Sequence, residues 1–200
     1  MISTFTAFFD ANVFYGARLR SLVLYTAQTK LFRARWSDMV HDEWVRNLLR
    51  NRPDLQPGDL ARTRDLMNAS VPDCLVSGYE PLIPCIDLPD PDDRHVVAAA
   101  IMTRANVIVT FNLKDFPLAS IEGFRIHTKH PDAFLMEAFS LGAHEIAEAV
   151  LNDYLHNRTP RLSFDRYRES LAQAGIPEFS KAIEPLEVLV PAEHAADVEL

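Results

Sequence analysis

Carboxylate side chains at four places in the first 115 residues could do chemistry together. Three lie close to the expected end of a strand or start of a helix, and the fourth lies within an expected helix. Asp10 follows the run "FTAFF", Glu43 lies in "HDEW", Asp93 in "DPDDRH" and Asp115 in "NLKDF". Carboxylate oxygens are the preferred ligands of hard divalent cations such as Mg²⁺. Carboxylates that converge also repel one another unless a cation lies between them. If the fold gathers these four acids, they could hold one or two metal ions for hydrolysis of a phosphodiester.

The segment "LPDPDDRHVVAAA", residues 88–100, has two compatible explanations. Asp90 as N-cap and Pro91 at the first helical position make a favourable helix start, and acids in the first turn favour the helix dipole. Capping does not account for Asp93, which shares one helical face with four apolar residues. These are Val96, Val97, Ala100 and Ile101. A carboxylate on a buried face is costly unless it is paired or bound to metal, so Asp93 is predicted to face a site, with Asp92 as a cap or an additional site residue.

The other acids also have ordinary structural explanations. Asp10 and Asp115 stand where turns and helix N-caps commonly use Asp. Glu43 lies at the border of an apolar helical stripe, where a solvated face would also place it, and Asp42 competes with it for the same role. Asn112, just before Asp115, could face the same site. The pattern alone leaves these alternatives open.

The elements that would position these residues alternate between strands and helices. Strands are expected at residues 5–9, 106–112 and 124–128, with a short one at 83–86. Helices are expected at residues 16–30, 37–50, 59–70 and 93–105. Continuously apolar strands that alternate with helices predict an α/β fold with a parallel sheet covered on both faces. Ligands of such sheets bind beyond the carboxyl ends of the strands, which is where Asp10 and Asp115 are expected.

From about residue 131 the pattern becomes helix after helix. We therefore expect one domain over residues 1–130 and a helical extension with an acidic tail over residues 131–200. Two apolar stripes mark the extension. They consist of Phe134, Leu135, Ala138 and Phe139, and of Val150, Leu151, Tyr154 and Leu155. Such stripes either pack on the chain's own core or form a contact with a partner.

Composition restricts the class of protein. The chain has 200 residues, of which 48% are hydrophobic, enough to form a core. Without a stretch of ~20 apolar residues or a recognisable leader at the N-terminus, a cytoplasmic protein with no membrane partner is expected. Cys74 and Cys85 are expected to be free thiols. The net charge is −8, yet ten of the 20 Lys and Arg residues fall within residues 18–64, which is compatible with a local phosphate-binding face.

Four segments resemble the acidic motifs of the PIN domain, in the same order and with compatible spacing. They are "FFDANVFY", "HDEWVRNLL", "LPDPDDRHVVAAAI" and "VIVTFNLKDFP". PIN domains are small metal-dependent ribonucleases, and many are the toxins of bacterial toxin–antitoxin pairs, the VapC-like group. The resemblance covers residues 6 to about 128. The part from residue 131 is similar, less specifically, to the helical C-terminal extension of one bacterial PIN subfamily.

The resemblance implies a PIN-like parallel sheet flanked by helices and a Mg²⁺- or Mn²⁺-dependent endoribonuclease. It assigns Asp10, Glu43, Asp93 and Asp115 as catalytic, with the three aspartates as metal ligands. Asn112 matches a supporting position, and Asp92 is a further candidate. The implied substrate is RNA. An antitoxin protein and a second copy of the chain are both left open as partners.

Two alternatives belong to other functional classes. A non-catalytic PIN-like module that binds proteins through its helical extension is disfavoured, because a site without function has no reason to keep four acids. A phosphatase with an Asp nucleophile is disfavoured because the common type has a second Asp two residues after the first. In this chain that position, two residues after Asp10, is Asn12.

Overall fold

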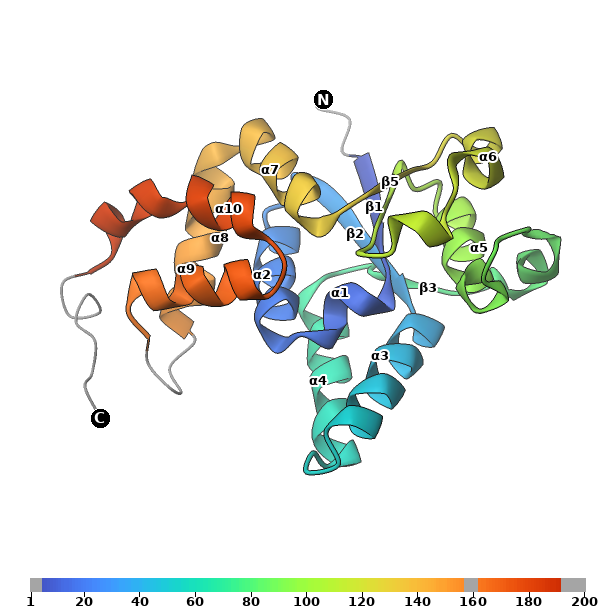
Figure 1. The fold of residues 1–200 in the computed structure, drawn as a ribbon, viewed down its shortest axis with the longest axis horizontal. Coiled ribbons are helices and arrows are strands. Elements are labelled where there is room, and N and C mark those ends of the chain that lie inside the picture. The colour runs from blue at the N-terminus through green and yellow to red at the C-terminus, as the bar shows by residue number, and fades with distance from the viewer. Residues whose placement is uncertain (1–4, 157–161, 192–200) are drawn as a thin grey trace. The chain divides into compact units, whose positions relative to one another are not determined.

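A computed structural model describes residues 5–156 and 162–191, and the chain divides into two compact units (Figure 1). The first unit contains residues 1–15 and 32–130, and the second contains residues 16–31 and 131–200. The second unit therefore includes residues 16–31, which we expected from the sequence to belong to the N-terminal domain. The acidic tail from residue 192 lies outside the described residues.

The first unit is built on a five-stranded sheet in which every strand pair is parallel (Figure 1). The strands are β1 (Phe5–Phe9), β2 (Phe32–Ser37), β3 (Leu75–Val76), β4 (Val107–Val109) and β5 (His127–Lys129), in the spatial order β3-β2-β1-β4-β5. The chain adds β2 and β3 on one side of β1 and then crosses over to add β4 and β5 on the other. The strand order thus reverses at β1, which makes the carboxyl ends of β1 and β4 the expected place for a site. The predicted parallel α/β fold is confirmed.

The helices of the first unit lie between its strands along the chain. They are α1 (Ala11–Tyr15), α3 (Asp38–Asn51), α4 (Pro57–Ser70), α5 (Arg94–Met102) and α6 (Leu118–Ile121), with 3₁₀ turns η1 (Glu80–Cys85), η2 (Pro91–Asp93), η3 (Leu113–Asp115) and η4 (Glu122–Phe124). Helix α5 contacts β1 and β4, whereas α3 contacts β2, α1 and α4. Because α5 is buried almost throughout, with buried residues His95 to Ala100, it sets the position of the residues just before it.

Strand β2 was not expected from the sequence, although its residues carry the two-residue period of a strand. Phe32, Ala34 and Trp36 are buried, while Arg33 is exposed and Arg35 half-buried between them. This alternation is typical of a strand with one covered face. The basic residues of this segment therefore belong to the sheet and not to a helix face.

Two predicted strands need correction. Residues 83–86 form no strand but lie mostly in the 3₁₀ turn η1, where Pro81 and Pro84 lack the N–H that a sheet ladder needs. The predicted strand at 124–128 begins only at His127. The chain before it ends η4 at Phe124 and adopts a left-handed conformation at Arg125, with φ 57°.

The second unit is helical throughout its described part. It comprises α2 (Ala17–Gln28), α7 (Pro131–Leu141), α8 (Ala143–His156), α9 (Phe164–Gln173), α10 (Pro177–Ala182) and the 3₁₀ turn η5 (Glu184–Leu189). Helix α2 packs on α8 and α9, and α7 packs on α8 and α10. The fully buried carboxylate of Asp153 on α8 accepts hydrogen bonds from Ser21 of α2 and, at 2.7 Å, from Tyr167 of α9. These contacts explain why residues 16–31 group with the C-terminal helices.

The apolar stripes of the extension lie mainly inside the second unit. Phe134, Leu135 and Ala138 of α7, and Val150 and Tyr154 of α8, are buried. Of the two alternatives, packing in the chain's own core therefore applies to these five residues, whereas Phe139, Leu151 and Leu155 are half-buried. Within the described residues, no helix has the length and apolar character required to cross a membrane.

Candidate active site

Asp10 lies at the carboxyl end of β1 and is 3% exposed. Its backbone N–H donates to the carbonyl oxygen of Val109 at the end of β4. One carboxylate oxygen accepts from the backbone N–H of Ala11 at 2.6 Å, and the other accepts from Asn12 Nδ2 at 2.6 Å and from the hydroxyl of Thr110 at 2.7 Å. Three donors from two chain segments therefore fix the direction of this carboxylate.

Burial raises the pKa of Asp10 to about 6. The hydrogen bond from Thr110 lowers it, and the negative charge of Glu43 raises it further. The hydrogen bonds thus offset only part of the cost of removing this carboxylate from water.

Asp93 ends the 3₁₀ turn η2, immediately before α5. As predicted, the Asp90 side chain caps this turn, accepting from the backbone N–H of Asp92 at 2.9 Å. Asp92 is exposed, whereas Asp93 is half-buried. Burial raises the pKa of Asp93 to about 7, and the negative charges of four neighbouring acids raise it as well. These are Asp10, Asp90, Glu43 and Asp115. Asp93 therefore lies within electrostatic range of the other three predicted catalytic acids.

Glu43 and its competitor Asp42 have different partners. A carboxylate oxygen of Glu43 lies 3.3 Å from Nε2 of His95 on α5. Asp42 pairs instead with Arg64 of α4 at 2.9 Å and is exposed. Since the charge of Glu43 acts on Asp10 and Asp93, Glu43 is the acid of α3 directed toward them.

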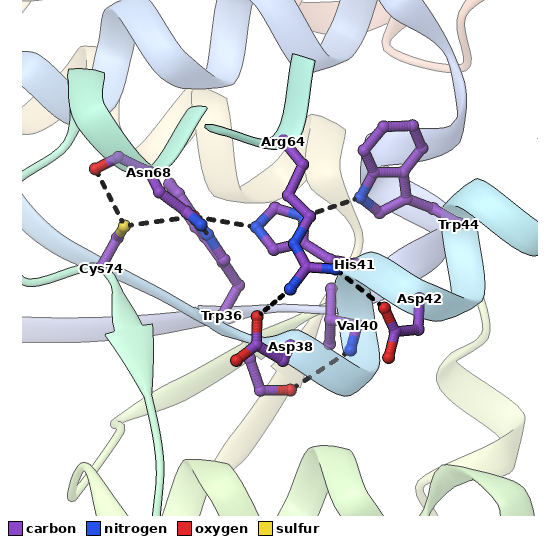
Figure 2. A network of polar contacts seen from close by, with 10 residues as sticks. Trp36, Asp38, Val40, His41, Asp42, Trp44, Arg64, Asn68 and Cys74 are labelled. Atoms are coloured by element: carbon purple, nitrogen blue, oxygen red, sulfur yellow. Dashed lines mark hydrogen bonds and ion pairs between the residues drawn. The ribbon is translucent and has the colours of Figure 1, made fainter. Parts of the chain in front are cut away.

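A network of polar contacts holds α3 in the orientation that directs Glu43 (Figure 2). Asn68 of α4 accepts from Trp36 Nε1 at 2.8 Å through an oxygen that also lies 2.9 Å from His41 Nε2. Trp44 Nε1 donates to the other ring nitrogen of His41 at 3.0 Å. Figure 2 also shows Arg64 bridging Asp38 and Asp42, the two exposed acids of α3.

A pocket of about 640 Å³ opens between α3 and the start of α5. It is lined by Met39, Asp42, Glu43, Arg46, Asn47, Arg50, Asp90, Asp92, Asp93, His95 and Asn112. Acids thus lie on both sides of the pocket, and two arginines of α3 extend along one wall. Asn112 lines the pocket, as a supporting residue would, whereas Asp10 and Asp115 are not part of the lining. Asp115 is half-buried at the end of η3.

The residues around this pocket fit a hard divalent cation in donor type and charge. In residues 5–156 and 162–191, no three His, Cys, Asp or Glu side chains are arranged as a ready cation site. The acids nevertheless offer oxygen donors, and burial first and neighbouring negative charges second raise the pKa values of Asp10 and Asp93. A bound cation would offset the repulsion between these carboxylates.

Several residues near the acids were not predicted from the sequence as part of the site. Asn12 and Thr110 hold Asp10, and His95 contacts Glu43. Asn12 and Thr110 also contact each other at 2.9 Å across almost 100 positions of chain. A local pattern carries no signal for such contacts. His95 had one available signal, its place two residues after Asp93 in a buried helix.

Comparison with known proteins gives a family and one partial relative. A PIN domain family model matches residues 6–114. Over 59 residues the chain is 48% identical to a protein of Mycobacterium tuberculosis (strain ATCC 25618 / H37Rv) named "Putative ribonuclease VapC50". That match covers 30% of this chain and only 34% of the relative. No solved structure matches the chain. Since the family model covers more than half of the sequence, the chain belongs to the PIN domain family.

Proposed function

We propose that the protein is a Mg²⁺- or Mn²⁺-dependent endoribonuclease. The observation that carries this proposal is the convergence of Asp10, Glu43, Asp93 and Asp115, whose mutual repulsion contributes to the pKa of about 7 at Asp93. Uncompensated charge of this kind is typical of sites that bind a cation for chemistry. Membership of the PIN domain family and the partial match to a protein named as a ribonuclease support the same conclusion.

In this proposal Asp10, Asp93 and Asp115 hold the cation, directly or through water, and Glu43 completes the site. A cation held there would supply an acidified water and would stabilise charge on the leaving oxygen. The chain supplies orientation. Asn12 and Thr110 keep the Asp10 carboxylate aimed in one direction. Such preorganisation lowers the cost of reaching the reactive geometry.

We propose RNA as the substrate, and the wall of the pocket offers groups that bind its phosphates. Arg46 and Arg50 line it on the same helix as Glu43, with Asn47 between them. Guanidinium groups bind phosphate oxygens, often through two parallel hydrogen bonds. Within RNA we propose single-stranded or looped segments, because their unpaired bases and bendable backbone are the usual targets of specific RNA recognition.

The first unit carries this activity in our proposal, and the second is a helical extension of it. A cytoplasmic toxin whose antitoxin covers the pocket is the biological role that we propose. Expression of the protein alone should then slow growth, and Asp115→Ala should relieve the effect. Normal growth despite abundant wild-type protein would argue against the toxin role but not against the nuclease.

The decisive experiment is RNA cleavage by the purified protein with Mg²⁺ or Mn²⁺, with and without a chelator. Asp93→Asn should abolish cleavage, whereas the matched variant Asp92→Asn should retain it, because Asp92 is exposed and lies outside the proposed ligand set. Cleavage that persists in a folded Asp93→Asn protein would contradict the proposal. A protein that binds Mn²⁺ but cleaves no RNA would favour the alternative, a non-catalytic PIN-like binding module.

A further inference from the structure

His95 contacts a group of four acids, Asp10, Glu43, Asp93 and Asp115, called here the acidic cluster. It has no role in the function proposed above. It belongs to the first turn of α5, two residues after Asp93, and is 4% exposed. Its ring lines the pocket, and Nε2 lies 3.3 Å from Oε2 of Glu43 on the facing helix α3. The buried imidazole on α5 therefore contacts Glu43, the candidate catalytic acid that lies on α3.

The surroundings of the ring determine which nitrogen carries the proton. Nδ1 of His95 is buried and has no hydrogen-bond partner among the described residues. A buried N–H without an acceptor destabilises the protein by the full cost of removing a donor from water. An unpaired nitrogen lone pair in the same place is less costly. The neutral ring therefore carries its proton on Nε2, and this N–H donates to Glu43.

Glu43 depends on that hydrogen bond for its direction. Its side chain is 27% exposed, and the contact with His95 is the one hydrogen bond that its carboxylate makes within the described part of the chain. The charges of Asp10 and Asp93 repel the Glu43 carboxylate and would favour rotamers that point into solvent. A long side chain also gains conformational entropy when it is released.

We infer that His95 is a positioning residue that holds Glu43 inside the acidic cluster through an Nε2–H···Oε2 hydrogen bond. Its catalytic consequence rests on the proposed nuclease function, but the hydrogen bond itself does not. Partners that orient a metal-site ligand typically change affinity or activity by about 10–100-fold when removed, which sets the expected size of the effect.

His41 provides an internal reference within the same unit. Its Nδ1 accepts from Trp44, and its Nε2 lies 2.9 Å from the Asn68 oxygen, so both ring nitrogens have partners and neither partner is an acid (Figure 2). The ring of His41 is thus fixed in the same Nε2–H form by groups that belong to the fold. His95 differs in having one partner, and that partner is a candidate catalytic residue.

The first test measures the hydrogen bond without any activity. Long-range ¹H–¹⁵N correlation spectra of metal-free protein labelled at histidine should show His95 and His41 as the Nε2–H tautomer. Glu43→Gln should shift the His95 ring signals and leave those of His41 in place. A His95 ring in the Nδ1–H form, or one unaffected by Glu43→Gln, would overturn the inference whether or not the protein cleaves RNA.

The second test asks whether the hydrogen bond acts through Glu43. His95→Leu should lower kcat on single-stranded RNA by about 10–100-fold with little change in KM. His95→Gln, which restores a side-chain N–H donor, should recover most of the loss. The matched control His144→Gln alters an exposed histidine of α8 and should change nothing.

A double substitution separates positioning from a general loss of stability. If His95 works through Glu43, adding His95→Leu to Glu43→Gln should lower kcat no further. An equal drop in both backgrounds, or an undiminished kcat in His95→Leu, would refute the positioning role. If the wild type itself cleaves no RNA, the proposed function fails, and the spectra alone still decide whether His95 holds Glu43.

Discussion

Asp10 and Asp93 are both acids with raised pKa values, but their hydrogen bonds differ. Asp10 accepts from three donors, whereas Asp93 makes no side-chain hydrogen bond within the described residues. Replacing either carboxylate by an amide removes the same repelling charge. Only at Asp10 does it also place an N–H₂ group among groups that themselves donate.

We therefore predict that Asp93→Asn raises the melting temperature of the metal-free protein at pH 8, while Asp10→Asn does not. Thermal unfolding in the presence of a chelator measures both. Asp92→Asn is the control, since its exposed carboxylate contributes at most a helix-dipole effect of ~0.3–1 kcal/mol. A larger gain for Asp10→Asn than for Asp93→Asn would mean that the three donors do not stabilise the ionised form.

The pH dependence of stability follows from the same two residues. An acid whose pKa is raised on folding binds more protons in the folded than in the unfolded state, so stability falls as pH rises through that interval. The interval runs from the ordinary value of 3.8 to about 6 for Asp10 and about 7 for Asp93. At about 1.4 kcal/mol per pH unit, the shift of Asp10 alone corresponds to about 3 kcal/mol.

The metal-free protein should accordingly be more stable to urea at pH 5 than at pH 8, and Asp93→Asn should reduce this difference. Mn²⁺ should reverse the trend, because it binds the deprotonated carboxylates and stabilises the folded state. Urea unfolding at the two pH values, with and without Mn²⁺, measures this. A wild-type stability that increases from pH 5 to pH 8 without metal would contradict the prediction.

At the scale of elements, sequence patterns predicted those that are strongly apolar or clearly capped. Strands β1 and β4 and helices α3 and α5 agree with expectation because burial dictates their composition. Strand β2 was missed because Arg33 and Arg35 interrupt its apolar residues. The wrong strand at residues 83–86 followed from apolar side chains, but two prolines favour a 3₁₀ turn there. Composition therefore predicts which residues are buried better than it predicts whether they form a strand or a 3₁₀ turn.

The same limit applies to the candidate site. The four acids could be proposed because Asp93 falls on a buried helical face and because the order and spacing of all four resemble the PIN motifs. Thr110 could not, because its contact with Asp10 spans 100 positions of sequence. For His95 the one signal was its place after Asp93, because its contact with Glu43 spans 52 positions. Long-range contacts of this kind depend on strand order and helix packing, which one sequence does not display.

Helix α3 presents a charged face whose role can be measured. Arg46→Gln and Arg50→Gln should weaken binding of single-stranded RNA and reduce its dependence on salt by about 0.7 in log–log slope per lost phosphate contact. Arg62→Gln on α4 removes the same charge from an exposed position outside the pocket and is the matched control. Catalytically inactive protein and fluorescence anisotropy at several salt concentrations give the slopes. Equal effects of all three substitutions would indicate unspecific attraction only.

At the scale of the whole molecule, the second unit is assembled from two separate stretches of chain. Truncation after His130 therefore removes α8 and α9 but leaves α2, whose apolar residues they cover. Leu19, Leu22 and Val23 of α2 are buried in the full chain. We predict that the truncated protein aggregates, as measured by light scattering.

The matched control for this truncation carries Leu19→Gln and Leu22→Gln in addition. It should remain soluble, because the exposed apolar area of α2 is reduced. The two versions would behave alike if α2 were not the cause of aggregation. A soluble, folded truncation without any substitution would show that the first unit tolerates the loss of the helices that cover α2.

The split arrangement of the second unit also sets an order of events on the ribosome. Residues 29–142 separate α2 from α8, the first of the two helices that cover it. At synthesis rates of about 5–20 residues per second, α2 waits for about 6–23 s before α8 exists. During that delay the apolar residues Leu19, Leu22 and Val23 of α2 lack the helices that bury them in the complete chain. We expect the nascent chain to be most prone to aggregation in this interval, which ends when α8 and α9 have been synthesised.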